Sequence, residues 1–355
     1  MVCEITKGIR PPLLPDRQNQ KDFFVCDIFD AAPKGDIASM AHPVFSLSTK
    51  PDYQPRRYED ESGKNYLQVK PSSDGLATIH DRDILIYCIS QIVAALNEGR
   101  EVQRVVRLKA YDLLKATNRV TDGRGYKALR SALARLQGTQ IETNITTGGT
   151  EQLDIFSIID RARILRETRD GRMQEVEIEL SDWVFNAIRH REVLTLHRDY
   201  FRLRKPLERR LYELARKHCG RQNQWRIGLS ALQRKCGSMS SPREFRRLVD
   251  AIVEQDKAHQ HIPDYAIQLE GNIVTFKNRG TMDALNHELV SNEDIHLNSE
   301  AHEHARRVAP GWDVHYLEQS WRSWMVDGGL DAPRDPNKAF VGFCVKWYEK
   351  RGRPT

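Results

Sequence analysis

Hydrophobic and polar residues follow two different periods along this chain, and each period predicts a different kind of element. Apolar residues recur at helical spacing over 81–97 and 206–218, which predicts two amphipathic helices. Elsewhere apolar and polar residues alternate, which predicts strands, and short polar turns join several of these strands into hairpins. The expected hairpins pair 56–58 with 66–69, 140–146 with 153–159, and 265–269 with 273–277. A separate strand is expected over 42–49.

One stretch of the pattern occurs twice, displaced by 119 positions without a gap. Matched positions include Arg107 with Arg226, Leu113 with Leu232, Arg124 with Arg243, Tyr126 with Phe245, Leu129 with Leu248 and Ala132 with Ala251. Each copy predicts a short strand, a short helix, a polar turn and a longer helix with an arginine near its start. That order is the core of a winged helix-turn-helix, whose second helix enters the major groove of DNA.

The repeat predicts an α+β fold with two tandem winged helix-turn-helix domains and a small α-helical C-terminal domain. The expected parts are a flexible N-terminal arm (1–20), a first winged-helix domain (21–195), a second winged-helix domain (196–280), a polar linker (281–300) and a Trp-rich helical domain (301–355). The first winged-helix domain is expected to contact DNA, and the second to read its sequence. Four of the chain's six tryptophans lie in the last part, enough for a small core of its own.

The predicted recognition helices, 122–136 and 241–255, each separate into an apolar face and a basic face. Arginine suits guanine, because its fork matches the O6 and N7 acceptors at the major-groove edge. A helix N-terminus also favours a nearby phosphate. A solvated surface without a partner is the alternative for any single arginine. The residues expected to contact DNA from these helices are Arg124, Lys127, Arg130, Arg135, Arg243, Arg246 and Arg247.

The chain's positive charge is concentrated in one segment. The formal net charge is +6, and residues 198–221 hold nine Lys or Arg against three Asp or Glu, which gives the same excess. Some of these cations can pair with Glu208 and Glu213 on their own helix. Phosphate contact is the expected use of the remainder. The candidates from this segment are Arg204, Lys205 and Arg209.

The motifs of several catalytic classes are missing from the sequence. There is no glycine loop ending in Gly-Lys-Ser/Thr for nucleotide phosphates. A rolling-circle nicking enzyme needs two histidines flanking an apolar residue on a strand, whereas 259–261 and 302–304 have polar middle residues and no strand pattern. We therefore expect no enzyme activity, no catalytic residue, no cofactor and no metal site. A nicking initiator stays an alternative that this argument disfavours.

The sequence also predicts the compartment. The longest apolar run, 84–96, is too short to span a bilayer, and residues 1–20 have no hydrophobic signal core. The six cysteines form no CxxC pair and show no regular spacing, which is typical of reduced, mostly buried thiols. We expect a cytoplasmic protein that does not enter a membrane.

Three long segments, 22–52, 75–99 and 191–220, resemble the plasmid replication initiator protein A family of proteobacteria. The similarity extends over roughly 22–280, and the C-terminal segment has the general character of small helical domains in primosomal and phage replication proteins. The resemblance implies tandem winged helices that bind repeated sites (iterons) in double-stranded DNA at a plasmid origin. It also implies that the protein helps to open the duplex and brings in the host replication initiator and the replicative helicase.

The same resemblance implies a homodimer, made through the first winged-helix domain, in equilibrium with a monomer. The dimer represses or limits copy number, and the monomer initiates. A transcriptional repressor built from the same modules is the main alternative, and the Trp-rich tail argues mildly against it. Gly123 and Gly125 flank Arg124 and are expected to weaken the start of the first recognition helix. The second winged-helix domain is therefore the stronger candidate for sequence reading.

Overall fold

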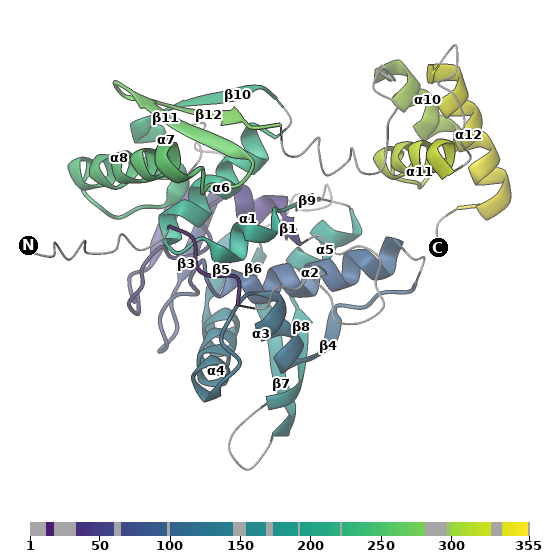
Figure 1. Cartoon of the computed structure of the whole chain (residues 1–355). Coiled ribbons are helices and arrows are strands. Elements are labelled where there is room, and N and C mark those ends of the chain that lie inside the picture. The colour runs from purple at the N-terminus through teal and green to yellow at the C-terminus, as the bar shows by residue number, and fades with distance from the viewer. Residues whose placement is uncertain are drawn as a thin grey trace, which may run out of the picture. The chain divides into compact units, whose positions relative to one another are not determined.

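The computed structural model describes most of the chain, which forms two compact units, Met1–Arg279 and Gly280–Thr355 (Figure 1). The described residues are 12–17, 33–59, 65–97, 100–144, 154–167, 173–190, 192–220, 222–280, 297, 299–327 and 336–353. Most of the expected N-terminal arm and of the expected linker lies outside these residues. The first unit combines helices with small sheets, and every pairing between its named strands is antiparallel.

One order of elements occurs twice in the first unit: helix, strand, helix, helix, hairpin. The first occurrence comprises α2 (Arg82–Asn97), β4 (Val105–Lys109), α3 (Ala110–Ala116), α4 (Gly123–Gly138), β7 (Ile159–Glu167) and β8 (Met173–Leu180). The second comprises α6 (Pro206–His218), β10 (Gln224–Gly228), α7 (Leu229–Cys236), α8 (Pro242–His259), β11 (Tyr265–Glu270) and β12 (Ile273–Asn278). The two three-stranded sheets also share their strand order, β4-β8-β7 and β10-β12-β11.

The predicted repeat is confirmed, element by element, at the displacement read from the sequence. Three pairs of equivalent positions are each 119 residues apart: Val105 and Gln224 start the strands, Ala110 and Leu229 start the short helices, and Asp122 and Ser241 cap the long helices. The apolar faces agree as well, since Tyr126 of α4 and Phe245 of α8 are both buried. The repeat is therefore one of structure as well as sequence.

The hairpin expected right after the first recognition helix forms, but it belongs to another sheet. Strands β5 (Gln140–Thr143) and β6 (Asp154–Ser157) pair with each other and join β2 (Arg56–Glu59) and β3 (Tyr66–Lys70) in the order β2-β3-β5-β6. The hairpin that completes the sheet of β4 is β7–β8 instead. Alternation identifies a hairpin locally, but it carries no information about which distant strand the hairpin will join.

The strand expected over 42–49 is absent, and only an isolated bridge between Ser46 and Thr78 forms there. Val44, Phe45 and Ser46 are buried in succession, so the segment is covered on both sides. A strand at the edge of a core would bury every second residue. The remaining elements of the first unit are β1 (Lys34–Asp36), α1 (Ile37–Ala41), α5 (Asp182–Arg189), β9 (Val193–Thr195) and the 3-10 helix η1 (Arg198–Arg202), and β1 pairs with β9.

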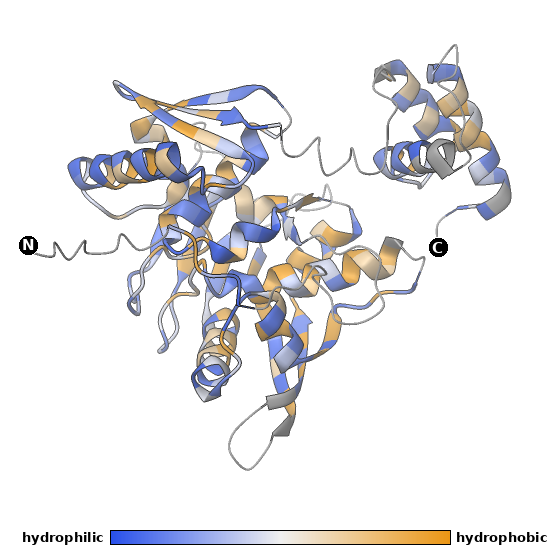
Figure 2. Ribbon diagram, in the orientation of Figure 1, coloured by the Kyte–Doolittle hydropathy of each residue, from blue (hydrophilic) through white to orange (hydrophobic). Residues whose placement is uncertain are grey.

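The core of the first unit forms around α2 and α6, which are central in the ribbon view (Figure 1). Helix α2 is apolar over most of its surface, as its orange colour shows in Figure 2, and nearly all of its residues are buried. Helices α4 and α8 bury a single face and show hydrophilic residues on the other (Figure 2). These two helices therefore present charged surface.

The second unit consists, in its described part, of α10 (Ser299–Val308), α11 (Val314–Asp327) and α12 (Pro336–Arg351). They pack around a shared core that includes Ala305, Leu317, Trp321, Phe340 and Cys344. Cys88, Cys219, Cys236 and Cys344 are all free and buried, as expected, whereas Cys3 and Cys26 lie outside the described residues. None of the helices in the described part of the chain combines the length and the apolar character needed to cross a bilayer.

Candidate nucleic-acid interface

The start of α8 is the best-formed part of the candidate interface. Ser241 caps the helix, its Oγ accepting a hydrogen bond from the backbone N–H of Glu244 at 3.3 Å, and Pro242 occupies the first turn. These are favourable residues for a helix N-terminus because they satisfy or remove its free N–H groups. Arg243 follows them and is exposed. Within the described residues its side chain has no hydrogen bond or ion pair, so the guanidinium is available to a partner.

Arg246 and Arg247 lie on the same side of α8 but are held by neighbours. Arg246 donates to Oδ1 of Asn272, in the turn between β11 and β12, at 2.9 Å and lies 3.8 Å from Asp250. Arg247 donates to both carboxylate oxygens of Glu244, at 2.8 and 2.6 Å. Exposed ion pairs of this kind contribute about 0–1 kcal/mol, so a phosphate or a base edge can compete for either arginine.

Helix α4 repeats this arrangement in the first half of the unit. The carboxylate of Asp122 accepts from the backbone N–H groups of Arg124 and Gly125 at 3.0 and 3.1 Å and pairs with the Arg124 side chain at 2.8 Å. Hydrogen bonds from Arg124 and Gly125 lower the pKa of Asp122. Arg124, Lys127 and Arg130 are all exposed. Three of the predicted contact residues therefore share the outer surface of α4.

The expectation that glycine weakens the start of α4 is wrong for Gly125. This residue is buried, and a Cβ placed on it would lie 1.9 Å from the carbonyl oxygen of Val120. Glycine is needed there because the preceding loop passes directly against the helix. With Asp122 accepting from two N–H groups, the helix start is well capped.

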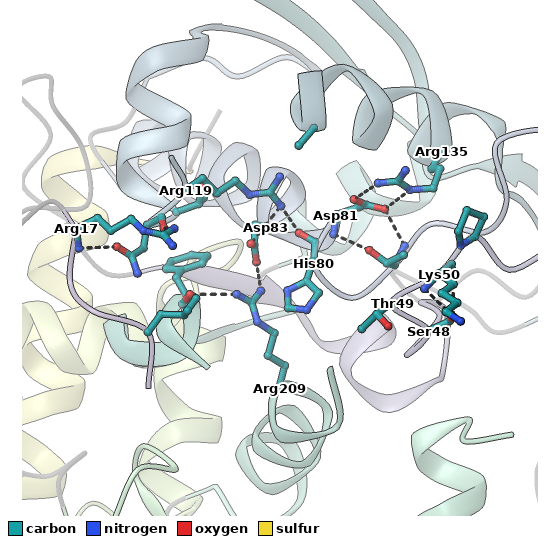
Figure 3. Close-up of a pocket in the computed structure, with 17 residues that line it drawn as sticks. Arg17, Ser48, Thr49, Lys50, His80, Asp81, Asp83, Arg119, Arg135 and Arg209 are labelled. Carbon is teal, nitrogen blue, oxygen red and sulfur yellow. Dashed lines mark hydrogen bonds and ion pairs between the residues drawn. The ribbon is translucent and has the colours of Figure 1, made fainter. Parts of the chain in front are cut away.

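Arg135, in the last turns of α4, faces inward rather than toward the outer surface. Its guanidinium donates to both carboxylate oxygens of Asp81 at 2.8 and 2.7 Å, and Figure 3 shows the two side chains pointing at each other. The hydrogen bond to Asp81 is the main cause that raises the pKa of Arg135. This bidentate, half-buried pair ties α4 to the loop before α2 and leaves Arg135 poorly placed for DNA.

The prediction that Arg209 contacts phosphate is wrong. Its side chain is only 3% exposed and pairs with Asp83 at 2.5 Å, while its remaining N–H groups donate to the carbonyls of Leu203 and Phe201, each at 3.1 Å. Its neighbour Arg210 is equally buried. Part of the positive charge counted over 198–221 therefore lies inside the molecule and neutralises buried acids.

A buried network of charges surrounds these two arginines. The carboxylate of Glu213 accepts hydrogen bonds from Arg82, from the hydroxyl of Tyr200 at 2.6 Å and from Arg210 at 3.3 Å. Arg82 lies 3.6 Å from Asp36, and none of these charged side chains is exposed by more than 3%. The network joins α2 of the first repeat to α6 of the second. No pattern in the sequence indicated it.

Arg204 and Lys205 precede α6 and lie nearer the surface. Arg204 is half-buried and Lys205 is exposed. The Nζ of Lys205 pairs with Glu208 at 3.1 Å and hydrogen-bonds Gln255 of α8. Of the candidates from 198–221, these two remain in reach of a partner next to α8.

A pocket of about 380 Å³ opens beside Arg135 and carries several more charges (Figure 3). In it Asp83 is flanked by Arg119 at 3.2 Å and by Arg209. Burial, and then the charges of Arg209 and Arg119, lower the pKa of His80 to about 3, so this imidazole is neutral. The charged groups of the pocket are largely paired with one another, which is typical of a structural cluster.

Comparison with known proteins places the chain in a family. The model of the replication initiator protein A family matches residues 34–267. A protein of Wigglesworthia glossinidia brevipalpis named "Putative replication protein" is 36% identical over 266 residues, which cover 73% of this chain and 94% of that protein. The chain therefore belongs to the replication initiator protein A family.

Solved structures similar to this chain include two crystal structures of domains 2 and 3 of RctB. One covers 68% of this chain and 98% of that chain, with a TM-score of 0.48 and 15% sequence identity. The other covers 70% and 99%, with a TM-score of 0.43 and 16% identity.

Proposed function

We propose that this chain is a plasmid replication initiator that binds repeated sequences at the origin through two winged helix-turn-helix modules and catalyses no reaction itself. In this proposal α4 and α8 are the recognition helices, and the hairpins β7–β8 and β11–β12 are the wings. Family membership supports the role in initiation. As further parts of the proposal, the protein helps to open the duplex and recruits the host initiator and the replicative helicase. It is in equilibrium between monomer and dimer in the cytoplasm.

The observation that carries the proposal is the structural repeat with a capped, basic helix in each copy. The order helix, strand, helix, helix, hairpin is that of a winged helix, and it occurs twice within one compact unit. Each long helix buries its apolar face and exposes basic residues in its first turns. A chain with two such helices is suited to two successive segments of one duplex.

Charge along α8 restricts how the helix can enter the groove. Arg243, Arg246 and Arg247 occupy its first turns, whereas Asp250 and Glu254 lie further along and are exposed. Carboxylates are repelled by phosphates, so the N-terminal half is the part expected to lie deep in the groove. Arg243 is the best candidate for a base contact, because it is exposed and has no partner within the described residues.

The test is binding and footprinting on the origin of the native plasmid. Protection is expected across repeats of about 20 base pairs, or two helical turns. Arg243→Ala or Arg246→Ala is expected to weaken specific binding by about 1–3 kcal/mol. Lys257→Ala is the matched control, because Lys257 lies at the other end of α8 and pairs with Glu254 at 2.7 Å. Equal effects of Arg243→Ala and Lys257→Ala would contradict the assignment of the reading surface.

Two other outcomes would redirect the proposal. Protection confined to one short palindrome favours a transcriptional repressor built from the same modules. Site-specific nicks in supercoiled origin DNA incubated with Mg²⁺ or Mn²⁺ favour a nicking initiator. Maintenance of an origin plasmid lacking the coding region, rescued by the protein in trans, tests the role in initiation directly.

A further inference from the structure

Three side chains that commonly ligate metals converge in the C-terminal unit. His302 is on α10, and His315 and Glu318 are three residues apart on α11, so they share one face of that helix. Their ligand atoms all lie within 4.8 Å of one another. Nε2 of His302 is 2.9 Å from Oε2 of Glu318, and the two imidazole centroids are 5.4 Å apart. These three side chains define the His302 cluster.

The carboxylate of Glu318 is oriented by a second residue of its own helix. Arg322 donates to Oε1 at 3.1 and 2.8 Å, which leaves Oε2 directed at His302. A hydrogen-bonded, oriented carboxylate is the form found at metal sites.

Packing against the core of the C-terminal unit holds the His302 side chain in place. The ring of His302 meets Phe340 edge to face at 5.9 Å, and Phe340 is fully buried against Trp321. This packing fixes the position of His302. His315 is exposed, so its ring can turn without disturbing the core.

We propose that His302, His315 and Glu318 bind a divalent transition-metal ion of the Zn²⁺ class. Two imidazoles and one carboxylate are a known three-ligand set for zinc, with the fourth position open to water or another ligand. Ligand atoms around a tetrahedral zinc ion lie about 3.4 Å apart, within the range spanned by the separations in the cluster. Metal binding would lengthen the 2.9 Å contact between His302 and Glu318 to that spacing, and the exposed His315 ring can turn toward the ion.

This proposal differs from the expectation of no metal site, which considered only histidines two residues apart in the sequence. His304 is not part of the His302 cluster and is exposed on the same helix. The partners of His302 come from α11 instead, and a sequence pattern does not show that contact. The site is contained in the second unit and is independent of the proposed DNA-binding function.

The experiment is metal binding by the full chain, prepared without a polyhistidine tag and stripped with a chelator. Titration with Co²⁺ is followed by its visible absorption, and Zn²⁺ is then added in competition. The wild type is expected to bind about one Co²⁺ ion with a tetrahedral spectrum that Zn²⁺ displaces. His315→Ala and Glu318→Gln are expected to weaken binding by at least about tenfold, and His304→Ala is the matched control with unchanged binding.

Circular dichroism of the metal-free variants shows whether each is folded, and His315→Ala keeps the test decisive because it removes an exposed side chain. A rise in the melting temperature of the wild type with Zn²⁺, absent in His315→Ala, supports the proposal. Absence of Co²⁺ binding by the wild type, or equal affinities in the wild type and His315→Ala, would overturn it and leave the cluster as a hydrogen-bonded contact between helices.

Discussion

Glu213→Gln tests whether the buried network holds the two repeats of the first unit together. The substitution keeps the size of the side chain and removes one negative charge from a site with no solvent exposure. Glu213 accepts hydrogen bonds from Arg82, Arg210 and Tyr200. A glutamine has one accepting oxygen, and its NH₂ group would face a donor.

The expected loss of stability follows from the charges left behind. Without Glu213, Arg82 retains Asp36 at 3.6 Å as its acidic partner, and Arg210 retains backbone carbonyls such as that of Met40 at 3.0 Å. Removing one member of a buried ion pair costs about 3–5 kcal/mol. A typical domain is stable by about 5–15 kcal/mol, so the variant is expected to be marginal or partly unfolded.

Urea unfolding followed by circular dichroism measures this loss as a change in midpoint at an unchanged slope. Glu254→Gln on α8 is the control, because Glu254 pairs with Lys257 at 2.7 Å on the surface and its loss is expected to cost less than about 1 kcal/mol. If Glu213→Gln loses no more than Glu254→Gln, the network does not stabilise the fold and the reasoning fails.

Three further predictions concern α4 and the pocket beside it. Gly125→Ala is expected to cost about 1–3 kcal/mol of stability in thermal unfolding, because the added Cβ would meet Val120. Gly123→Ala is expected to be neutral or stabilising, because its added Cβ would have nothing within 4 Å. Equal effects of the two substitutions would contradict the close approach at Gly125. Lys127→Ala is expected to weaken DNA binding equally across sequences and to reduce the salt slope by about 1, and a loss confined to one sequence would contradict a phosphate contact. The pKa of His80 is about 3 in the fold because of burial, so as pH falls from about 6.5 toward 3 only the unfolded chain gains this proton. Stability is then lost by about 1.4 kcal/mol per pH unit. His80→Asn is expected to reduce this slope in acid unfolding, and parallel curves of stability against pH for the wild type and the variant would disprove the prediction.

The elements of the repeat could be predicted because their signals are local. Ser241 and Pro242 are residues typical of a helix N-terminus, so the start of α8 could be predicted, and the spacing of its apolar residues indicates the buried face. Leu248, which the repeat matches with the buried Leu129, is only half-buried, whereas its neighbour Val249 is fully buried. The sheet joined by β5 and β6 could not be predicted, because strand partners far apart in sequence are chosen by tertiary packing.

The exposure of most charged candidates on α4 and α8 could be predicted from the sequence, whereas the burial of charge on α6 could not. The pattern of α6 places leucines on one face and arginines on the other, which by itself indicates a solvated basic surface. In the structure all residues from Leu207 to Ala215 are buried, because the charged face is covered as well. The acid that pairs with Arg209, Asp83, is more than a hundred positions away in the sequence, and no local pattern links the two.

The position of this network bears on how the two proposed modules can act. Arg210 donates to the carbonyl of Met40 at the end of α1 and to that of Lys235 near the end of α7, at 3.0 and 2.7 Å. Helix α7 directly precedes α8, and through Glu213 the network also reaches Arg82 of α2 in the first repeat. Satisfied buried networks hold their members in one arrangement, because breaking any bond strands a charge in the core. The two proposed recognition helices, α4 and α8, are therefore held by a common core rather than by a flexible linker, which suits the proposed binding of sites at a fixed spacing along one duplex.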